Sequence, residues 1–379
     1  MECKFIKHGI ALSYDQVLKP CCAWRTTPDW AKQNHYKSTE IQNWHQSAPV
    51  IKQYQILQNN QWPQHCSECE SIENQTREDS MRGNGNRSYA DYVDDDITLE
   101  IRPGNTCNFA CQTCWPEASS RVAQYHGQAG LIDIKNLNSQ RLDDFDFLLP
   151  VAHRIKDVVL LGGEPFYDKA CLKFLRWAQQ HLQSHVMMFT NGSMVDRNFL
   201  QSHAGKITII FSLDAVGRPA EYIRPGTVWP DVLANYRAVR ALPNVQVRVN
   251  VTCSAYNYWH LPDLLNLLCE DWPGVVTFGQ PREDWYKESV IPMSLRPLLI
   301  EQLTQVLTKI NATDIESGQK HNALNAVKSI ITNLSQLDFS VDNHASFCEF
   351  VRRMDRVKQL NAADYCDFLS KILTDRYMP

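Results

Sequence analysis

Cys107-Asn108-Phe109-Ala110-Cys111-Gln112-Thr113-Cys114 places three cysteines in a Cys-x3-Cys-x2-Cys loop, directly after the apolar, β-branched run at 97–101. Thiolate is the ligand that iron–sulfur clusters and zinc prefer, so three thiols this close in sequence can converge on one metal centre. Structural zinc sites have four protein ligands, whereas reactive sites keep one position open. Because no fourth Cys or His follows at zinc-finger spacing, the loop favours an iron–sulfur cluster, with zinc as the alternative.

A second motif lies further along the chain, at Asp157-Val158-Val159-Leu160-Leu161-Gly162-Gly163-Glu164-Pro165. Its apolar run predicts a buried strand that ends in Gly-Gly-Glu-Pro. Two glycines allow the backbone to approach a ligand closely, and proline stops strand pairing. This pattern is typical of a strand end that binds a ligand.

Together the two motifs resemble the radical S-adenosylmethionine (SAM) superfamily. The resemblance implies that Cys107, Cys111 and Cys114 bind a [4Fe–4S] cluster whose fourth iron is chelated by SAM. It also implies SAM contacts from the strand end, at Gly162, Gly163, Glu164 and Pro165. The family more often has an aromatic residue near the adenine at the position of Thr113, so Phe109 or Trp115 would take that role here.

Composition limits the class of protein. The chain has 379 residues, 44% of them hydrophobic and 21% charged, which predicts a globular protein of two or three domains. A net charge of -4 and a pI of about 6.3 predict no nucleic-acid partner. We expect neither a membrane partner nor export, because no apolar run is long enough for either. Thirteen cysteines then indicate metal ligands in a reducing cytoplasm.

The N-terminal part has its own cysteines, at Cys3, Cys21-Cys22 and Cys66-Ser67-Glu68-Cys69. Apolar pieces at 9–12 and 17–18 flank a polar turn, which predicts a β-hairpin. A hairpin that presents cysteines, followed by a Cys-x2-Cys turn, can enclose one tetrahedral metal or one four-iron cluster. The segment from 29 to 62 shows no clear periodicity, and we expect irregular helices there.

This part resembles the twitch module, the shortened relative of the SPASM domain, which holds one auxiliary [4Fe–4S] cluster. Glu73 and Ser80-Met81-Arg82 fit the subset in which the module precedes the barrel. The resemblance implies four ligands, namely Cys3, Cys21, Cys66 and Cys69. Cys22 competes for the role of Cys21, Cys3 has the alternative of a packed free thiol, and zinc is the alternative metal.

From residue 97 onward, short apolar runs alternate with helical patterns, which indicates βα units and a parallel sheet. Strands are predicted at 97–102, 157–161, 185–190, 207–213, 245–252 and 274–279, and a helix at 169–183. Six such strands match the partial (β/α)6, TIM-like barrel of the superfamily. In a parallel barrel, the ligand site forms at the C-terminal ends of the strands, where both motifs lie.

Other strand ends supply further candidates. Thr190-Asn191-Gly192 and Ser212-Leu213-Asp214 resemble strand ends of SPASM and twitch enzymes, which implies SAM contacts from Thr190, Asn191, Ser212 and Asp214. Arg224 is a candidate partner for a carboxylate of SAM or substrate, or a plain surface ion pair. Cys253 lies near the mouth and is a candidate hydrogen-atom donor, although a buried packing role is the favoured interpretation.

The C-terminal part is predicted to be helical, at 294–310 with Ser294 as N-cap, 322–334, 346–359 and 362–374, with a turn or extended piece at 338–343. The predicted division is therefore a small α+β iron–sulfur module at 1–96, the barrel at 97–290 and a helical extension at 291–379. The overall class is α/β.

The resemblance implies an enzyme that cleaves SAM reductively and abstracts a hydrogen atom from its substrate. We expect a peptide or protein side chain as substrate, with a sugar, nucleoside or amino acid as the alternative. An electron donor such as flavodoxin or ferredoxin would be the partner. A non-catalytic metal-binding protein remains the hypothesis of another class.

Overall fold

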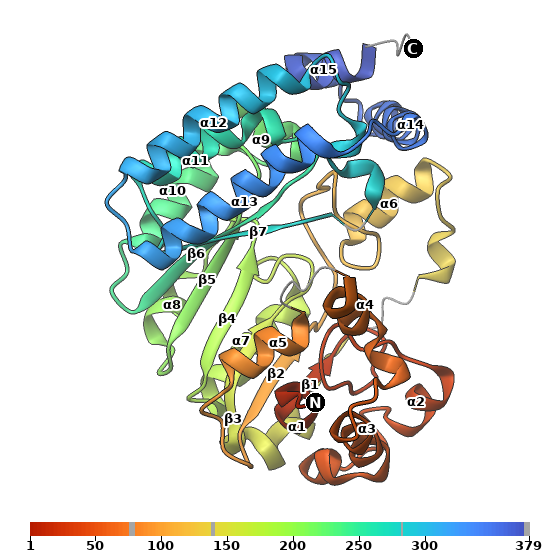
Figure 1. Ribbon diagram of the computed structural model, residues 1–379. Coiled ribbons are helices and arrows are strands. Elements are labelled where there is room, and N and C mark those ends of the chain that lie inside the picture. The colour runs from red at the N-terminus through yellow and green to blue at the C-terminus, as the bar shows by residue number, and fades with distance from the viewer. Residues whose placement is uncertain (76–79, 138–140, 282, 375–379) are drawn as a thin grey trace. The chain divides into compact units, whose positions relative to one another are not determined.

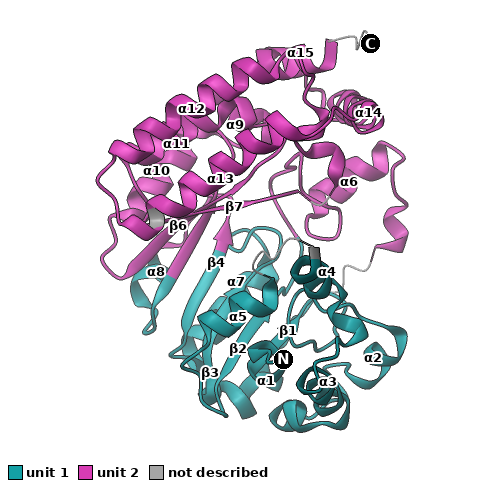
Figure 2. Ribbon diagram, in the orientation of Figure 1, with its two compact units in different colours: residues 1–105, 138–188, 198–207 teal, residues 106–137, 189–197, 208–379 magenta. Residues whose placement is uncertain are grey.

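A computed structural model describes residues 1–75, 80–137, 141–281 and 283–374 (Figure 1). The chain divides into two units (Figure 2). Unit 1 comprises residues 1–105, 138–188 and 198–207, and unit 2 comprises residues 106–137, 189–197 and 208–379. The three-part division at 96 and 290 stays a prediction.

In the described residues, seven strands follow one another in the sheet in chain order, from β1 to β7. They are β1 (Gly9–Leu12), β2 (Ile97–Ile101), β3 (Ile155–Leu160), β4 (His185–Thr190), β5 (Ile207–Ser212), β6 (Val245–Thr252) and β7 (Val275–Gly279). The pairings β1–β2, β2–β3 and β3–β4 in unit 1 and β6–β7 in unit 2 are all parallel. The α/β class is therefore confirmed, and each of the six strands predicted from apolar runs is present.

The predicted N-terminal hairpin is wrong in its pairing. Ala11 and Lys19 do form one antiparallel bridge, but residues 17–18 make no strand. β1 instead pairs in parallel with β2, from Gly9 opposite Thr98 to Leu12 opposite Ile101. All four β1 residues are buried, and burial on both faces is typical of a parallel strand rather than of an exposed hairpin.

The helices of the N-terminal half are short. They are α1 (Lys4–His8), α2 (Pro28–Gln33), α3 (Ala48–Gln58), α4 (Ser67–Gln75), α5 (Met81–Ser88) and α6 (Ser120–Gln128). The expectation of irregular helices at 29–62 is confirmed by α2, α3 and a 3-10 helix at Ile41–Gln46. Further on come α7 (Lys169–His181), α8 (Arg197–Ser202), α9 (Gly217–Ile223), α10 (Trp229–Arg240) and α11 (Leu261–Glu270).

α7 confirms the helix predicted at 169–183 and shows why it forms. Its buried positions include Cys171, Phe174, Leu175 and Ala178, a stripe of three- and four-residue spacings. The Asp168 carboxylate caps the helix by accepting a hydrogen bond from the Ala170 N–H at 2.8 Å.

The C-terminal part is helical, as predicted, with α12 (Arg296–Ala312), α13 (Ser317–Gln336), α14 (Val341–Lys358) and α15 (Asp367–Thr374). Two details differ. The cap position of α12 is Leu295 rather than Ser294. The predicted turn at 338–343 is partly helix, because Ser340 Oγ accepts from the Asn343 N–H and starts α14 at Val341.

No helix in the described part of the chain is both long and apolar enough to cross a bilayer.

A buried arginine joins α12 to α13. Arg296 is 2% exposed, and its Nε donates to Ile291 O at 2.9 Å. Its Nη1 donates to Leu334 O at 3.0 Å and also to Leu337 O. Because the last carbonyls of a helix lack partners within the helix, Arg296 satisfies the C-terminal end of α13.

Replacing this arginine tests the joint. Arg296→Met leaves three carbonyls without their donor, so we expect the free energy of unfolding to fall by about 3 kcal/mol. Arg356→Met, on the exposed side of α14, should change it by less than about 0.5 kcal/mol. Urea unfolding followed by circular dichroism measures both. Equal losses in the two variants would refute the role of Arg296.

Candidate functional site

The cysteine loop at 107–114 belongs to unit 2 and is fixed by backbone hydrogen bonds. The Ala110 N–H donates to Pro225 O at 2.9 Å, and the Gln112 N–H donates to Ile223 O at 2.8 Å. Gly226 closes this contact with a φ of +110°, and a Cβ there would lie 2.8 Å from Asn108 O. The sequence therefore needs glycine at 226 for the two segments to meet.

The thiols of the loop affect one another electrostatically and have hydrogen-bond donors. Burial raises the pKa of Cys114, and the Cys111 and Cys107 thiolates raise it further. Cys107 Sγ accepts from the Phe109 N–H at 3.4 Å and from Asn191 Nδ2 at 3.9 Å. N–H donors around sulfur favour the thiolate form that binds metal.

Arg224 is fixed beside Cys111 by a buried carboxylate. Its Nε donates to Asp214 Oδ2 at 2.8 Å, and its Nη1 donates to Cys111 Sγ at 3.6 Å. Asp214 is held in turn by the Thr252 N–H at 2.8 Å. Burial opposes the charge on Arg224, but Asp214 and the Cys111 thiolate raise the pKa of the guanidinium above its usual value. The ion pair is thus buried rather than on the surface; a contact of Arg224 with SAM stays a prediction.

Lys358, which sequence reasoning missed, contacts the same loop. Its Nζ donates to Ala110 O at 3.0 Å and to Gln112 Oε1 at 2.8 Å. Burial lowers the pKa of Lys358 to about 8, while the Cys111 thiolate and Asp355 act in the opposite direction. Lys358 ends α14, far from the loop in sequence and outside any spacing pattern, so no sequence signal pointed to it.

Of the other predicted residues, Asn191 is brought to the loop, where its Nδ2 donates to Asn108 Oδ1 at 2.9 Å. Thr190 is buried, and its Oγ1 accepts from the Gly192 N–H at 3.1 Å. Phe109 and Cys253 are each 1% exposed, whereas Ser212 and Trp115 are partly exposed. The roles predicted for these side chains stay predictions.

The Gly-Gly-Glu-Pro strand end belongs to unit 1 and follows β3. Gly162 has a φ of +152°, and a Cβ there would lie 2.8 Å from Gly104 O and 3.1 Å from Cys171 Sγ. Glu164 is 1% exposed, and its Oε1 accepts from the Phe166 N–H at 3.3 Å. Close packing around Gly162 explains the need for glycine; SAM contacts from residues 162–165 stay a prediction.

Four cysteines gather in unit 1. Burial raises the pKa of Cys21, and the thiolates of Cys22, Cys3, Cys66 and Cys69 raise it further. Burial likewise raises the pKa of Cys66 to about 12, with Cys3 and Cys69 adding to it. For Cys22, burial raises the pKa and the Glu100 carboxylate adds to it. The groups that raise the pKa of Cys21 thus include the three other predicted ligands, and the choice between Cys21 and Cys22 stays a prediction.

An aromatic stack draws the two cysteine segments together. The Trp24 ring lies parallel to His65, with centroids 4.6 Å apart, and the Arg25 N–H donates to His65 O at 3.0 Å. Since His65 precedes Cys66 and Trp24 follows Cys22, the stack brings one pair of thiols to the other.

Glu73, Ser80 and Arg82 lie near the remaining thiols. Arg82 forms an ion pair with Glu73, and its Nη1 donates to Glu2 O at 2.8 Å. The Arg82 N–H and the Ser80 hydroxyl lower the pKa of Cys69, although burial raises it overall. For Cys3, burial raises the pKa to about 11, against the N–H groups of Ile6 and Phe5. Both thiols thus have donors that favour the thiolate.

The donor chemistry of both cysteine sets fits an iron–sulfur cluster. Among the residues that the structure describes, no three Cys, His, Asp or Glu side chains lie together in a way that could hold a single metal ion. A [4Fe–4S] cluster is held by cysteine thiolates, one at each iron, so its ligands surround a larger group than an ion. Thiols with N–H donors around them are the ligands expected for a [4Fe–4S] cluster.

Residues 103–215 match the family model described as a 4Fe-4S single cluster domain. The matched segment includes the cysteine loop, the Gly-Gly-Glu-Pro strand end and the strand ends at Thr190-Asn191 and Ser212-Asp214. The match agrees with the radical SAM resemblance on an iron–sulfur site in this segment. A search of curated proteins finds no match.

Several solved structures are similar to the chain at low identity. Streptococcus suis SuiB bound to precursor peptide SuiA has a TM-score of 0.38 and 14% identity, over 61% of this chain and 52% of SuiB. Native anSMEcpe with bound AdoMet has a TM-score of 0.43 and 16% identity, over 58% of this chain and 63% of anSMEcpe. A mutant of spore photoproduct lyase with bound AdoMet and dinucleoside spore photoproduct has a TM-score of 0.34 and 12% identity, over 72% of this chain and 82% of the lyase. The chain thus spans about half the length of SuiB.

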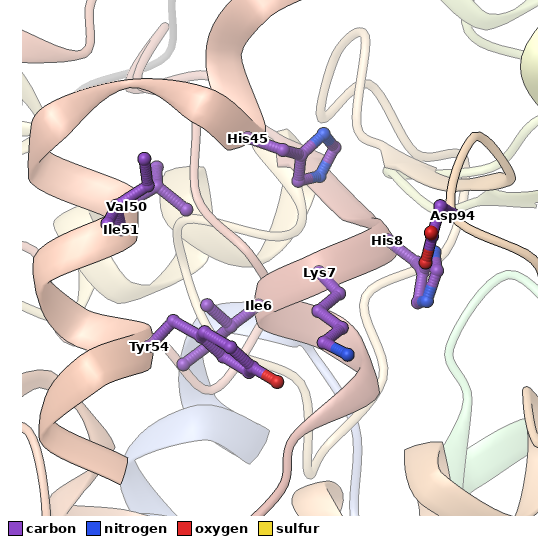
Figure 3. A pocket seen from close by; sticks show the side chains of 8 residues that line it. All are labelled: Ile6, Lys7, His8, His45, Val50, Ile51, Tyr54 and Asp94. Atoms are coloured by element: carbon purple, nitrogen blue, oxygen red, sulfur yellow. The ribbon is translucent and has the colours of Figure 1, made fainter. Parts of the chain in front are cut away.

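Unit 1 also contains a small pocket of about 210 Å³ near α1 and α3 (Figure 3). The Lys7 ammonium lies 5.2 Å from the centre of the Tyr54 ring. His8 Nδ1 donates to Asp96 O and His45 Nε2 donates to Gly9 O, both at 3.0 Å. Burial lowers the pKa of His45 to about 4, so this imidazole is neutral at neutral pH and fixes the start of β1.

The tight packing at Gly162 can be tested by adding a single methyl group. Gly162→Ala should lower the free energy of unfolding by about 3 kcal/mol, because the Cβ meets backbone at a strained φ. Gly318→Ala is the matched control: its Cβ meets nothing within 4 Å inside α13, so a gain of about 0.5 kcal/mol is expected. Denaturant titration measures both, and a neutral Gly162→Ala would contradict the close approach.

The lowered pKa of His45 predicts that the stability of the folded chain depends on pH. Its pKa is lower in the folded chain, about 4, than the ordinary 6.5, so unfolding takes up a proton between these values. Its contribution is complete above pH 6.5 and is lost as the pH falls, by about 3 kcal/mol at pH 4. His45→Gln should flatten this slope in the metal-free protein, and exposed His153→Gln should not. Identical slopes in the parent and His45→Gln would refute the assignment.

Proposed function

We propose that this chain is a radical SAM enzyme whose Cys107, Cys111 and Cys114 bind a [4Fe–4S] cluster. The proposal is supported by three cysteines on one loop whose Cys107 and Cys111 sulfurs accept hydrogen bonds from Asn191, the Phe109 N–H and Arg224, inside the segment that matches a 4Fe-4S single cluster domain. When bound, the cluster supplies the electron that breaks the C5′–S bond of SAM, giving methionine and a 5′-deoxyadenosyl radical that takes a hydrogen atom from the substrate.

The chain's own residues prepare the thiols for this cluster. Thiolates are required as ligands, and burial alone disfavours them. Arg224, oriented by Asp214, donates to Cys111, and Asn191 and the Phe109 N–H donate to Cys107. SAM is bound by the backbone at 162–165 and by Thr190, Asn191, Ser212 and Asp214 in this proposal, with Phe109 or Trp115 near the adenine.

A second cluster belongs to the proposal. Cys3, Cys21, Cys66 and Cys69 hold an auxiliary [4Fe–4S] cluster, as in a twitch module. The mutual effect of these thiols on one another's pKa supports the set, and the position of Cys22 beside Glu100 supports Cys21 as the fourth ligand. Zinc in the same thiols is the competing assignment, which metal analysis distinguishes.

The proposed substrate is a peptide or protein side chain, because SPASM and twitch enzymes act mostly on peptides or small molecules. A flavodoxin or ferredoxin supplies the electron, and the enzyme works in the cytoplasm. All thirteen cysteines are free thiols, which supports a reducing location. Cys253, which is 1% exposed, is kept in this proposal as a candidate hydrogen-atom donor, with a buried packing role as the favoured interpretation.

Iron content and SAM cleavage test the two clusters separately. The anaerobically reconstituted parent should contain about eight irons per chain and form 5′-deoxyadenosine from SAM with dithionite. Cys111→Ala should lose about four irons and the cleavage, because one ligand of the SAM-binding cluster is gone. Cys69→Ala should lose the other four irons and keep the cleavage. Cys269→Ala, outside both sets, should keep both.

Each departure from this pattern has a defined meaning. Zinc in place of four irons, removed by Cys69→Ala, would overturn the auxiliary cluster alone. Parent protein without SAM cleavage, and indistinguishable from Cys111→Ala, would overturn the radical SAM assignment and favour a non-catalytic metal-binding protein. Cleavage that is stimulated by an amino acid, sugar or nucleoside and not by peptides would favour the small-molecule alternative.

A further inference from the structure

Lys358 stands apart from every predicted site residue because it comes from the C-terminal helical part. It is the last residue of α14, and the chain leaves the helix at Gln359 with a left-handed φ of +55°. α14 contacts α6, the helix that follows the cysteine loop (Figure 1). The end of α14 thereby reaches the loop within unit 2.

The Lys358 ammonium has three partners, all in the segment that contains the loop. It donates to Ala110 O at 3.0 Å and to Gln112 Oε1 at 2.8 Å, and it lies 5.9 Å from the centre of the Tyr125 ring. Ala110 and Gln112 are the residues on either side of Cys111. A partly buried cation held by a carbonyl, an amide oxygen and an aromatic face is fixed in position.

A closed set of hydrogen bonds supports this position. Gln112 Nε2 donates to Tyr222 O at 3.2 Å, and the Tyr222 hydroxyl donates to Asp355 Oδ1 at 2.8 Å. Asp355 lies one turn before Lys358 on α14, and it also accepts from the Ala362 N–H at 3.0 Å. The end of α14 and the side chain of Gln112 therefore hold each other through two separate routes.

We infer that Lys358 is a positioning residue for the cluster held by Cys107, Cys111 and Cys114: it clamps the loop on both sides of Cys111 and sets a positive charge beside the thiolates. This inference rests on the proposed function. Reduction adds one negative charge to a cluster, and a fixed cation nearby favours the reduced form. Lys358 thus raises the reduction potential of the SAM-binding cluster, in addition to holding the loop closed.

The first test measures the reduction potential of the cluster whose electron paramagnetic resonance signal changes on addition of SAM. Lys358→Met keeps an apolar stem and removes the charge, so the equilibrium constant for one-electron reduction should fall about tenfold, a shift of about 59 mV to more negative potential. Lys358→Arg should restore it to within about twofold. Lys328→Gln, an exposed lysine of α13, is the charge-matched control and should leave it unchanged.

The second test needs no cluster. In the metal-free protein, the amides of Ala110 and Gln112 are protected by their bonds to Pro225 and Ile223. Hydrogen exchange of the segment with these amides should be at least about tenfold faster in Lys358→Met than in the parent or in Lys328→Gln. This readout still decides on the clamp if Lys358→Met fails to bind iron.

The outcomes separate the inference from the proposed function. A parent that binds no SAM-responsive cluster overturns the proposed function, while hydrogen exchange still tests the clamp. A Lys358→Met protein that holds its cluster at the parental potential overturns the electrostatic role. Unchanged exchange of the loop amides overturns the positioning role.

Discussion

The cysteine loop depends on compensation of buried negative charge. Burial raises the pKa of the Cys111 and Cys114 thiols, so the thiolates that a cluster requires are costly unless cations and N–H donors face them. Arg224, held by Asp214, and Lys358, held by the loop itself, provide that charge. The helical C-terminal part thus takes part in the site, where the sequence had indicated only helices with an apolar face.

The N-terminal cysteines meet the same requirement by other means. No buried cation pair surrounds all four sulfurs in the described residues; instead, Arg82 lies near Cys3 and Cys69, and backbone N–H groups supply further donors. The stack of Trp24 on His65 brings the segments together before any metal is bound. A site whose scaffold closes through aromatic contacts, with its thiols still protonated, can take up a metal as the thiols release their protons.

The sequence predicted those features that depend on local pattern. β-branched runs gave the six barrel strands, and the spacing of cysteines and glycines gave the loop and the Gly-Gly-Glu-Pro strand end. It misplaced β1, because four apolar residues beside a turn fit a hairpin as well as a parallel strand. Lys358 and Arg296 were missed because they donate to backbone carbonyls, and such contacts do not depend on the residue type of the partner. The choice between Cys21 and Cys22 stays a prediction, because spacing cannot distinguish two adjacent thiols.

The most direct test of the account is an anomalous difference map at the iron edge from anaerobically grown crystals of the reconstituted protein with SAM. We expect iron bound to Cys107, Cys111 and Cys114, with Lys358 Nζ still donating to Ala110 O. Iron at Cys3, Cys21, Cys66 and Cys69 would be the second peak. A loop without iron, or one whose metal is completed by a fourth side chain of the protein, would contradict it.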